Sequence, residues 1–250
     1  MEKKLLLGVV VVVCLCGSAA LALDPMGPPA ASLKKGNFSA GAEWSYTDMD
    51  ILRQGGWGGE MWGPLNMKMH KIYANLGYGI TDNWDLFTRL GGAYMEFSSG
   101  SSDWSNQWEG HDTSVPAAGA GAKYTFYEDT NFKLGGLAQF SWVTFDGSQQ
   151  PTLSGSDYEK SNYVLELIEW QFAIGPTWTP SDNTAIYGGP LWHVVDGWLS
   201  QGKNRGIIEK SDFGLFVGGQ IDMSTNCFVN IEWIYTSQAN GFAAGLIWKY

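Results

Sequence analysis

Four pairs of alternating segments, each joined by a short polar turn, constrain the fold of this chain most strongly. The pairs are residues 72–80 with 86–97, 117–127 with 132–145, 164–178 with 185–195, and 213–222 with 227–235. Apolar residues at every second position predict β-strands. The turns are rich in Asp, Asn, Thr and Ser, whose short side chains bond the local backbone and favour tight hairpins. Because no segment shows convincing helical amphipathicity, we expect an all-β chain.

Two further strands bring the expected number to about ten. In the first, Phe38, Trp44 and Tyr46 share one face, and residues 242–250 alternate in the same way at the other end of the chain. Such a strand suits the wall of a membrane barrel, where one face contacts lipid and the other faces a polar lumen.

The connections between these segments alternate in length. The four turns are short, whereas the segments between hairpins are long: 50–65, 98–114, 147–161 and 197–210. Aromatic residues bracket the short turns, and a second set lies one strand of about 9–11 residues away. This pattern is typical of a single antiparallel transmembrane β-barrel with short periplasmic turns, long extracellular loops and two aromatic girdles.

The alternative is a soluble periplasmic β-barrel or sandwich, because alternation suits both folds. In that case the polar faces would be solvated and rich in Lys and Glu. Here the polar faces are rich in Gly with isolated charges, and only 16% of the residues are charged although Trp numbers 13. These features favour the membrane barrel, in which Trp and Tyr lie at the lipid–water interfaces.

Residues 1–22 are predicted to be a cleaved signal peptide. Two lysines precede an apolar run that ends at Cys16, and residues 20–22 form a small-residue cleavage site. An N-terminal membrane anchor is the alternative, but the apolar run is short for a span of about 20 residues. Residues 23–34, rich in Pro, Gly and Ala, are expected to be a flexible leader. The barrel would then occupy 35–250.

Charge and cysteine content limit the possible partners and cross-links of the chain. The chain has 25 Asp and Glu against 15 Lys and Arg. This acidic balance argues against a nucleic-acid partner. Removal of the signal peptide leaves Cys227 alone, so no intramolecular disulfide can form.

Charged and amide residues on the polar faces are candidates for the lumen. Phasing each strand by its apolar face points eight of them inward: Glu43, Arg89, Lys123, Lys133, Gln139, Gln171, Gln220 and Glu232. A buried charge must be paired or hydrated. Glu43 and Glu232 could therefore pair with Arg89, Lys123 or Lys133 to fill the barrel, or the same residues could gate a small pore. Strand phase does not show which of these charges pair with one another. It also does not assign Glu169 to the inner or the outer face.

The long loops are a second candidate site. They contain Trp57, Trp62, Trp104 and Trp108, close to carboxylates. Exposed Trp residues can stack on sugar rings or bind a partner surface, which would be an extracellular ligand. Alternatively, they fold back on one another or rest on the membrane surface.

Signals for catalysis are weak. The histidines are His70, His111 and His193, and no Cys or His cluster completes a metal site. His193 is expected near the outer end of a strand, but no matching serine or aspartate motif accompanies it. We therefore expect no catalytic residue, no metal and no cofactor, and no enzymatic activity.

Together, the signal peptide, the Thr/Ser-Asp-Asn turns and the closing strand resemble those of small bacterial outer-membrane β-barrel proteins, the OmpA-like and Opa-like "porin family". This resemblance implies outer-membrane lipid and the barrel-insertion machinery as partners, and it implies that the last strand carries the assembly signal. The residues of that signal would be Phe242, Leu246, Trp248 and Tyr250. The implied function is an envelope-structural or surface-interaction role through the loops. The alternatives are a narrow diffusion pore and an outer-membrane enzyme.

Overall fold

The computed structural model describes residues 23–54, 61–99, 108–151, 161–201, 204–237 and 239–250. For the strand ends nearest the gaps, only the backbone is described. No helix within these ranges is long and apolar enough to cross a membrane.

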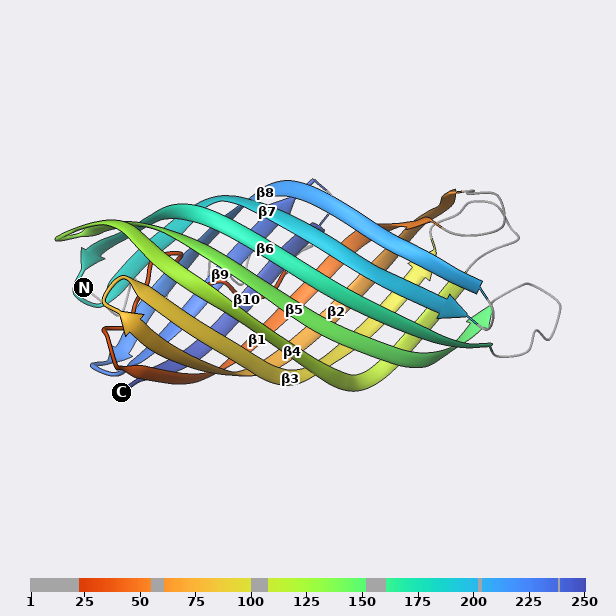
Figure 1. The fold of residues 1–250 in the computed structure, drawn as a ribbon, viewed down its shortest axis with the longest axis horizontal. Coiled ribbons are helices and arrows are strands. Elements are labelled where there is room, and N and C mark those ends of the chain that lie inside the picture. Colours follow the sequence, from red (N-terminus) through yellow and green to blue (C-terminus); the bar gives the residue numbers. More distant parts are fainter. Residues whose placement is uncertain (1–22, 55–60, 100–107, 152–160, 202–203, 238) are drawn as a thin grey trace, which may run out of the picture.

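Ten antiparallel strands form one closed barrel, which confirms the predicted fold class (Figure 1). The strands are β1 (Phe38–Gln54), β2 (Met61–Thr81), β3 (Trp84–Ser99), β4 (Trp108–Asp129), β5 (Phe132–Pro151), β6 (Ser161–Ser181), β7 (Thr184–Gln201), β8 (Asn204–Ser224), β9 (Cys227–Thr236) and β10 (Ala239–Lys249). Each strand pairs with its neighbour in sequence, and β1 pairs with β10 to close the ring. The closing strand therefore lies where its alternation predicts.

Most strands are much longer than their alternation suggested. The strands β1 to β8 have 16 to 22 residues, whereas β9 and β10 have 10 and 11. Much of the sequence expected to form long loops is therefore strand ladder. Above the short β9–β10 hairpin, β1 pairs directly with β8 at Arg53 and Gln54. A tilted membrane strand needs about 9–11 residues, so β1 to β8 are longer than a bilayer requires.

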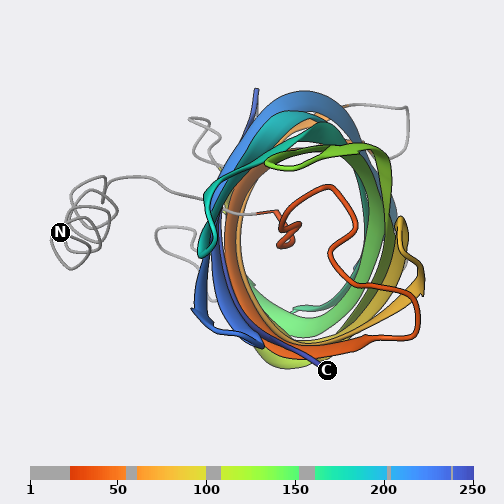
Figure 2. The ribbon, with the colours of Figure 1, turned by 90° about the vertical axis from the view of Figure 1, so that its left-hand side faces the viewer.

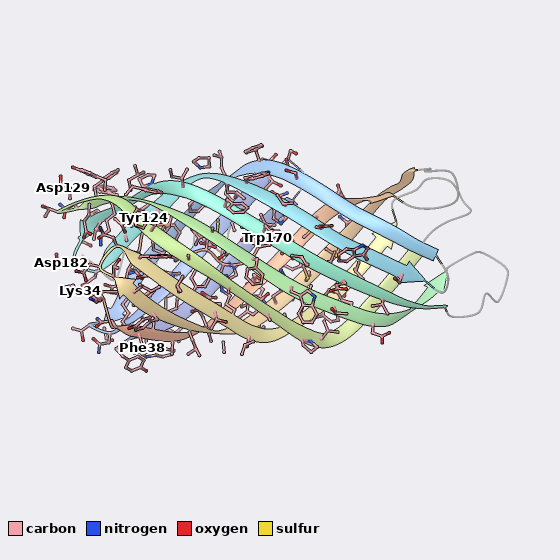
Figure 3. All side chains as sticks on the ribbon, in the orientation of Figure 1. Lys34, Phe38, Tyr124, Asp129, Trp170 and Asp182 are labelled. Atoms are coloured by element: carbon pink, nitrogen blue, oxygen red, sulfur yellow. The ribbon has the colours of Figure 1, made fainter. Side chains whose placement is uncertain are left out.

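Two aromatic girdles surround the outer wall. One lies at the end with the short turns and includes Phe38 and Tyr124; the other includes Trp170 and lies near the middle of the barrel's length (Figure 3). Trp170, Phe172 and Trp192 form part of a ladder of ring contacts in the second girdle. We call the part between the girdles the turn half and the part beyond Trp170 the loop half.

The two halves have opposite amphipathicity. In the turn half, the side chains facing outward are apolar, whereas many facing the lumen are polar or charged. In the loop half the interior is apolar and fully enclosed, formed by Met49, Met67, Met69, Met95, Val143, Phe145, Leu165 and Leu167. Its outward positions are instead mostly polar: Asp48, Asp50, Lys68, Glu96, Asp146 and Asp196. The loop half thus packs like a water-soluble barrel, and the turn half like a membrane barrel.

Residues 23–35, which we call the N-terminal segment, lie largely inside the barrel. Viewed from the turn end, this segment runs within the ring of strands before it joins β1 (Figure 2). Leu23, Asp24, Met26, Ala30 and Ala31 are each at most 3% exposed. The structure therefore differs from the expected flexible leader, because these residues are held as a plug in the turn half.

Candidate functional site in the barrel lumen

The deep end of the N-terminal segment is held by a buried cation. Lys71 on β2 places its Nζ 3.0 Å from Asp24 Oδ1 and 2.6 Å from Glu169 Oε1 on β6. All three side chains are almost completely buried. Lys71 therefore compensates two carboxylates, one from the segment and one from the wall.

The second oxygen of Glu169 faces His193 on β7. Glu169 Oε2 lies 3.4 Å from His193 Nε2, and within the described part of the chain neither atom has a hydrogen-bond partner. Both side chains are 1% exposed. His193 is therefore an interior residue beside the plug, and not a residue near the outer rim.

Arg89 on β3 joins the wall to the segment in the next layer. Its Nε donates to Glu43 Oε2 at 2.6 Å, its Nη1 donates to Gln139 Oε1 at 2.9 Å, and its Nη2 donates to the Pro25 carbonyl. One guanidinium thus connects β1, β5 and the segment. This fork of fixed donors suits a role in holding three groups in place.

Two wall carboxylates each accept a pair of consecutive backbone amides. Glu232 on β9 accepts from the N–H groups of Met26 at 2.5 Å and Gly27 at 2.8 Å. Asp85 accepts from Ser32 at 2.6 Å and Leu33 at 3.0 Å. These bonds satisfy amides that the segment could not pair in a strand ladder. Charge-assisted bonds of this kind are among the stronger hydrogen bonds in proteins.

Small residues in the wall and the segment make the fit possible. A Cβ at Gly135 on β5 would lie 2.3 Å from the Cα of Ala30, and one at Gly79 on β2 would lie 2.2 Å from the Lys34 carbonyl oxygen. Gly27 has a φ of +65°, which few other residues adopt. Any side chain at these wall positions would collide with the segment.

Small spaces remain between the segment and the wall. One cavity of about 50 Å³ is lined by residues including Arg89 and Lys123, and another of about 150 Å³ near the turns includes Lys133 and Asp222. Both are far smaller than a typical ligand pocket of roughly 300–1,000 Å³. They are large enough for water molecules.

The predicted lumen residues fall into two groups. Glu43, Arg89 and Glu232 are buried inside, and of the pairings left open the structure shows Glu43 with Arg89. Glu232 instead binds the backbone of the segment. Lys123 lies over the Phe87 ring, 5.8 Å from its centroid.

Lys133 has a different environment. Its Nζ is 2.8 Å from Glu128 Oε1, and both side chains are about one-third to one-half exposed. It therefore forms a pair at the turn end of the barrel. Among the predicted amides, Gln139 and Gln171 are buried together beside Arg89, while Gln220 bonds Asp222 on its own strand.

Sequence reasoning missed the most important partners in the lumen. The N-terminal segment has no alternation, so nothing in its pattern indicates that it lies inside the barrel. Lys71 could have been found, because it lies between Met69 and Tyr73 on the face opposite the exposed Ile72. Glu169 was ambiguous because the loop half reverses the apolar face of β6.

The loop tryptophans are only partly described. Trp57 and Trp104 lie outside the described residues. Trp62 and Trp108 are at the outer ends of β2 and β4, where their backbones pair with Arg53 and Pro151. Their proposed contacts with a ligand therefore stay predictions.

The predicted assembly residues face away from the lumen. Leu246, Trp248 and Tyr250 are exposed on the outer wall, and Phe242 packs against Trp44 there. The backbone of Tyr250 exchanges two hydrogen bonds with Phe38, so the last residue completes the β1–β10 contact. In the described ranges no group of three His, Cys, Asp or Glu side chains could hold a metal ion.

Comparison with known proteins supports the architecture alone. No protein-family model matches the chain, and no curated protein matches it. The outer-membrane protease OmpT of Escherichia coli is similar at a TM-score of 0.51 and 11% identity, over 88% of this chain and 99% of that one. The fold is that of bacterial outer-membrane barrels. OprG of Pseudomonas aeruginosa (TM-score 0.48, 11% identity, 87% and 97% covered) and the translocator domain of the autotransporter NalP of Neisseria meningitidis (0.48, 10%, 86% and 88%) are also similar.

Proposed function

We propose that this chain is an integral outer-membrane protein that does not conduct, and that it serves envelope structure or surface contacts through its loop half and loops. The observation that carries this proposal is the continuous filling of the lumen. The N-terminal segment occupies the turn half, and packed apolar side chains occupy the loop half. A barrel closed at both levels offers no path for ions or solutes.

The outer wall supports the location. Between the girdles it presents large apolar side chains to its surroundings, such as Ile72, Leu90 and Leu215, each about 60% exposed. A contiguous apolar band of this size is unfavourable in water and suits lipid. Above it, the polar exterior of the loop half would extend beyond the membrane, where it could contact an extracellular ligand or a surface partner. A cleaved signal peptide and the barrel-insertion machinery would deliver the chain there.

The test is the conductance of refolded residues 23–250 in a planar bilayer, with a heat-dependent gel shift to show that the barrel is folded. We expect a folded barrel without steady channels. Steady conductance that changes on Arg89→Ala or Glu43→Gln would contradict the proposal and would indicate a pore lined by these residues.

A narrow, gated pore is the second candidate. The observation that favours it is the pair of small cavities between the segment and the wall, which could hold a chain of water molecules. Opening such a pore would require movement of both the segment and the apolar interior of the loop half. Rare, voltage-induced channels would support this candidate over the closed barrel.

A further inference from the structure

The turn half binds the N-terminal segment mainly through the segment's main chain. Glu232, Asp85 and Thr125 accept hydrogen bonds from its backbone amides, and Arg89 and Gln139 donate to its carbonyl groups. The clear exception is the side chain of Asp24, which is bound by Lys71. The wall therefore has the properties of a peptide site that recognises the main chain of a bent segment.

Release of the segment would not disrupt the sheet. The ten strands form a closed ring with one another, and the segment joins the wall through side chains of the wall. Ala30 packs on Gly135 and the Lys34 carbonyl lies close to Gly79, so the segment is held by shape, by hydrogen bonds and by the Asp24–Lys71 ion pair. The hydrogen-bonded ring of strands is therefore complete without residues 23–35.

The site is closed at its deep end and open at the turns. Leu23 is fully buried and belongs to the same apolar cluster as the interior of the loop half. At the other end Lys34, Lys35 and Asn37 are exposed at the barrel mouth. Figure 2 shows the segment entering through this mouth. An N-terminus created by cleavage after residue 22 would thus lie at the bottom of a blind chamber.

We propose that the turn half is a blind, periplasm-facing peptide site, and that its occupant is the chain's own N-terminal segment, inserted end-first and releasable. The orientation toward the periplasm rests on the proposed outer-membrane location. Release would expose a polar chamber containing Arg89, Glu232 and Asp85. It would not open a through-pore, because the interior of the loop half remains packed above the chamber.

The first experiment measures release in the full mature chain. Cys227→Ser removes the one cysteine after residue 22, and Ala31→Cys places a thiol in the buried part of the segment. The protein is inserted in lipid vesicles of known orientation and treated with a bulky, membrane-impermeant maleimide. We expect slow labelling from the turn side, at a rate that does not rise with reagent concentration once release is limiting.

Matched variants test the hydrogen bonds. Glu232→Gln together with Asp85→Asn should speed labelling roughly tenfold to a hundredfold, because bonds to charged groups are lost. Asp129→Asn is the control, since Asp129 is exposed and accepts from the Thr130 amide of its own turn. Asn37→Cys, which is already exposed, should label rapidly in every background. Absence of labelling at Ala31→Cys, or labelling as fast as Asn37→Cys, would contradict a bound but releasable segment.

The second experiment tests the vacated site. The bulky label prevents Ala31→Cys from returning, so a fluorescent peptide of residues 23–33 should now bind with one-to-one stoichiometry. A scrambled peptide that places the prolines elsewhere should not bind. A peptide extended to residues 18–33 should bind much more weakly, because the deep end has no room for added residues. Gly135→Leu should abolish binding by occupying the place of Ala30.

The other outcomes of the labelling and peptide-binding experiments each contradict one part of the proposal. A labelled barrel that keeps its heat-dependent gel shift but binds no peptide would contradict the peptide site. Loss of the gel shift on labelling would make the segment a permanent part of the core and would contradict release. Conductance of the unlabelled chain would instead contradict the proposed function, so the two failures are distinguishable.

Discussion

The turn half and the loop half are built from the same strands and yet pack in opposite ways. On β2, Lys71 and Asn75 face the lumen while Ile72 faces outward. Closer to the loop end of the same strand, Met67 and Met69 face the lumen while Lys68 faces outward. The backbone alternation is unbroken, so only the chemistry of the two faces exchanges. The exchange coincides with the second aromatic girdle.

The difference shows that the surroundings of each half decide which face is apolar. In the proposed location, lipid outside the turn half would remove any penalty for apolar side chains there, and buried polar side chains can pair across the lumen. Water would surround the loop half, so apolar side chains there are stabilised by packing in the interior. The segment supplies partners to polar groups in the lumen of the turn half, whereas apolar side chains fill the loop half by themselves.

The largest expected effect is at the ion cluster in the turn half. Lys71→Met should lower the free energy of unfolding by about 3–5 kcal/mol, because it leaves Asp24 and Glu169 buried without their cation. Urea unfolding in lipid vesicles, followed by Trp fluorescence, measures this change. The control is Lys68→Met on the same strand, whose exposed side chain should contribute little. Equal effects of both variants would contradict the assignment of the two faces.

The next effect belongs to the interior of the loop half. Met69→Ala should destabilise the barrel by about 2–5 kcal/mol, because it leaves a cavity among packed apolar side chains. Met223→Ala is the matched control, since Met223 is 66% exposed near a turn. The same urea titration reports both. A Met69 variant as stable as the parent would mean that the loop half is loosely filled, and would favour a gated pore.

The third prediction compares outward-facing side chains of the two halves on β3. Leu90 faces outward between the girdles, and Leu90→Lys should cost about 2–4 kcal/mol, as a cation does near the midplane of a lipid-facing wall. On the same face of β3, Glu96→Leu should change stability by only about 0.5 kcal/mol, since water surrounds the loop half. A small effect at Leu90 would mean that lipid does not cover this band, and would contradict the outer-membrane location.

Much of the fold was predictable from sequence because alternation and turn chemistry are local. Ten strands, their order and the closing strand follow from the period of two and from the Asp-Asn turns. The length of the strands was not predictable in this way. On the loop side of Trp44 and Trp170, the apolar residues lie on the inner face of the strand. The assumption that every apolar residue faces outward is therefore wrong there.

For the interior of the turn half, the sequence predicted which residues face inward but not which of them contact one another. Strand phase places Glu43 and Arg89 on inward faces, but their pairing depends on the tilt and register of strands that are not neighbours. The N-terminal segment was not predictable at all. Its Pro and Gly residues exclude a regular element, and the same composition suits both a free leader and a peptide held by the wall.

The smallest expected effect separates a lumen charge from a charge at the barrel mouth. Lys133 and Lys71 both form ion pairs shorter than 3 Å, with Glu128 and Glu169 respectively. The Lys133 pair is partly solvated, so Lys133→Met should change stability by about 0–1 kcal/mol. Salt should weaken even that contribution, because exposed charges are screened, whereas the Lys71 effect should be nearly independent of salt. Urea titrations of both variants at low and high salt measure the difference. A large, salt-independent effect at Lys133 would place this side chain inside the lumen, where its strand phase predicted it.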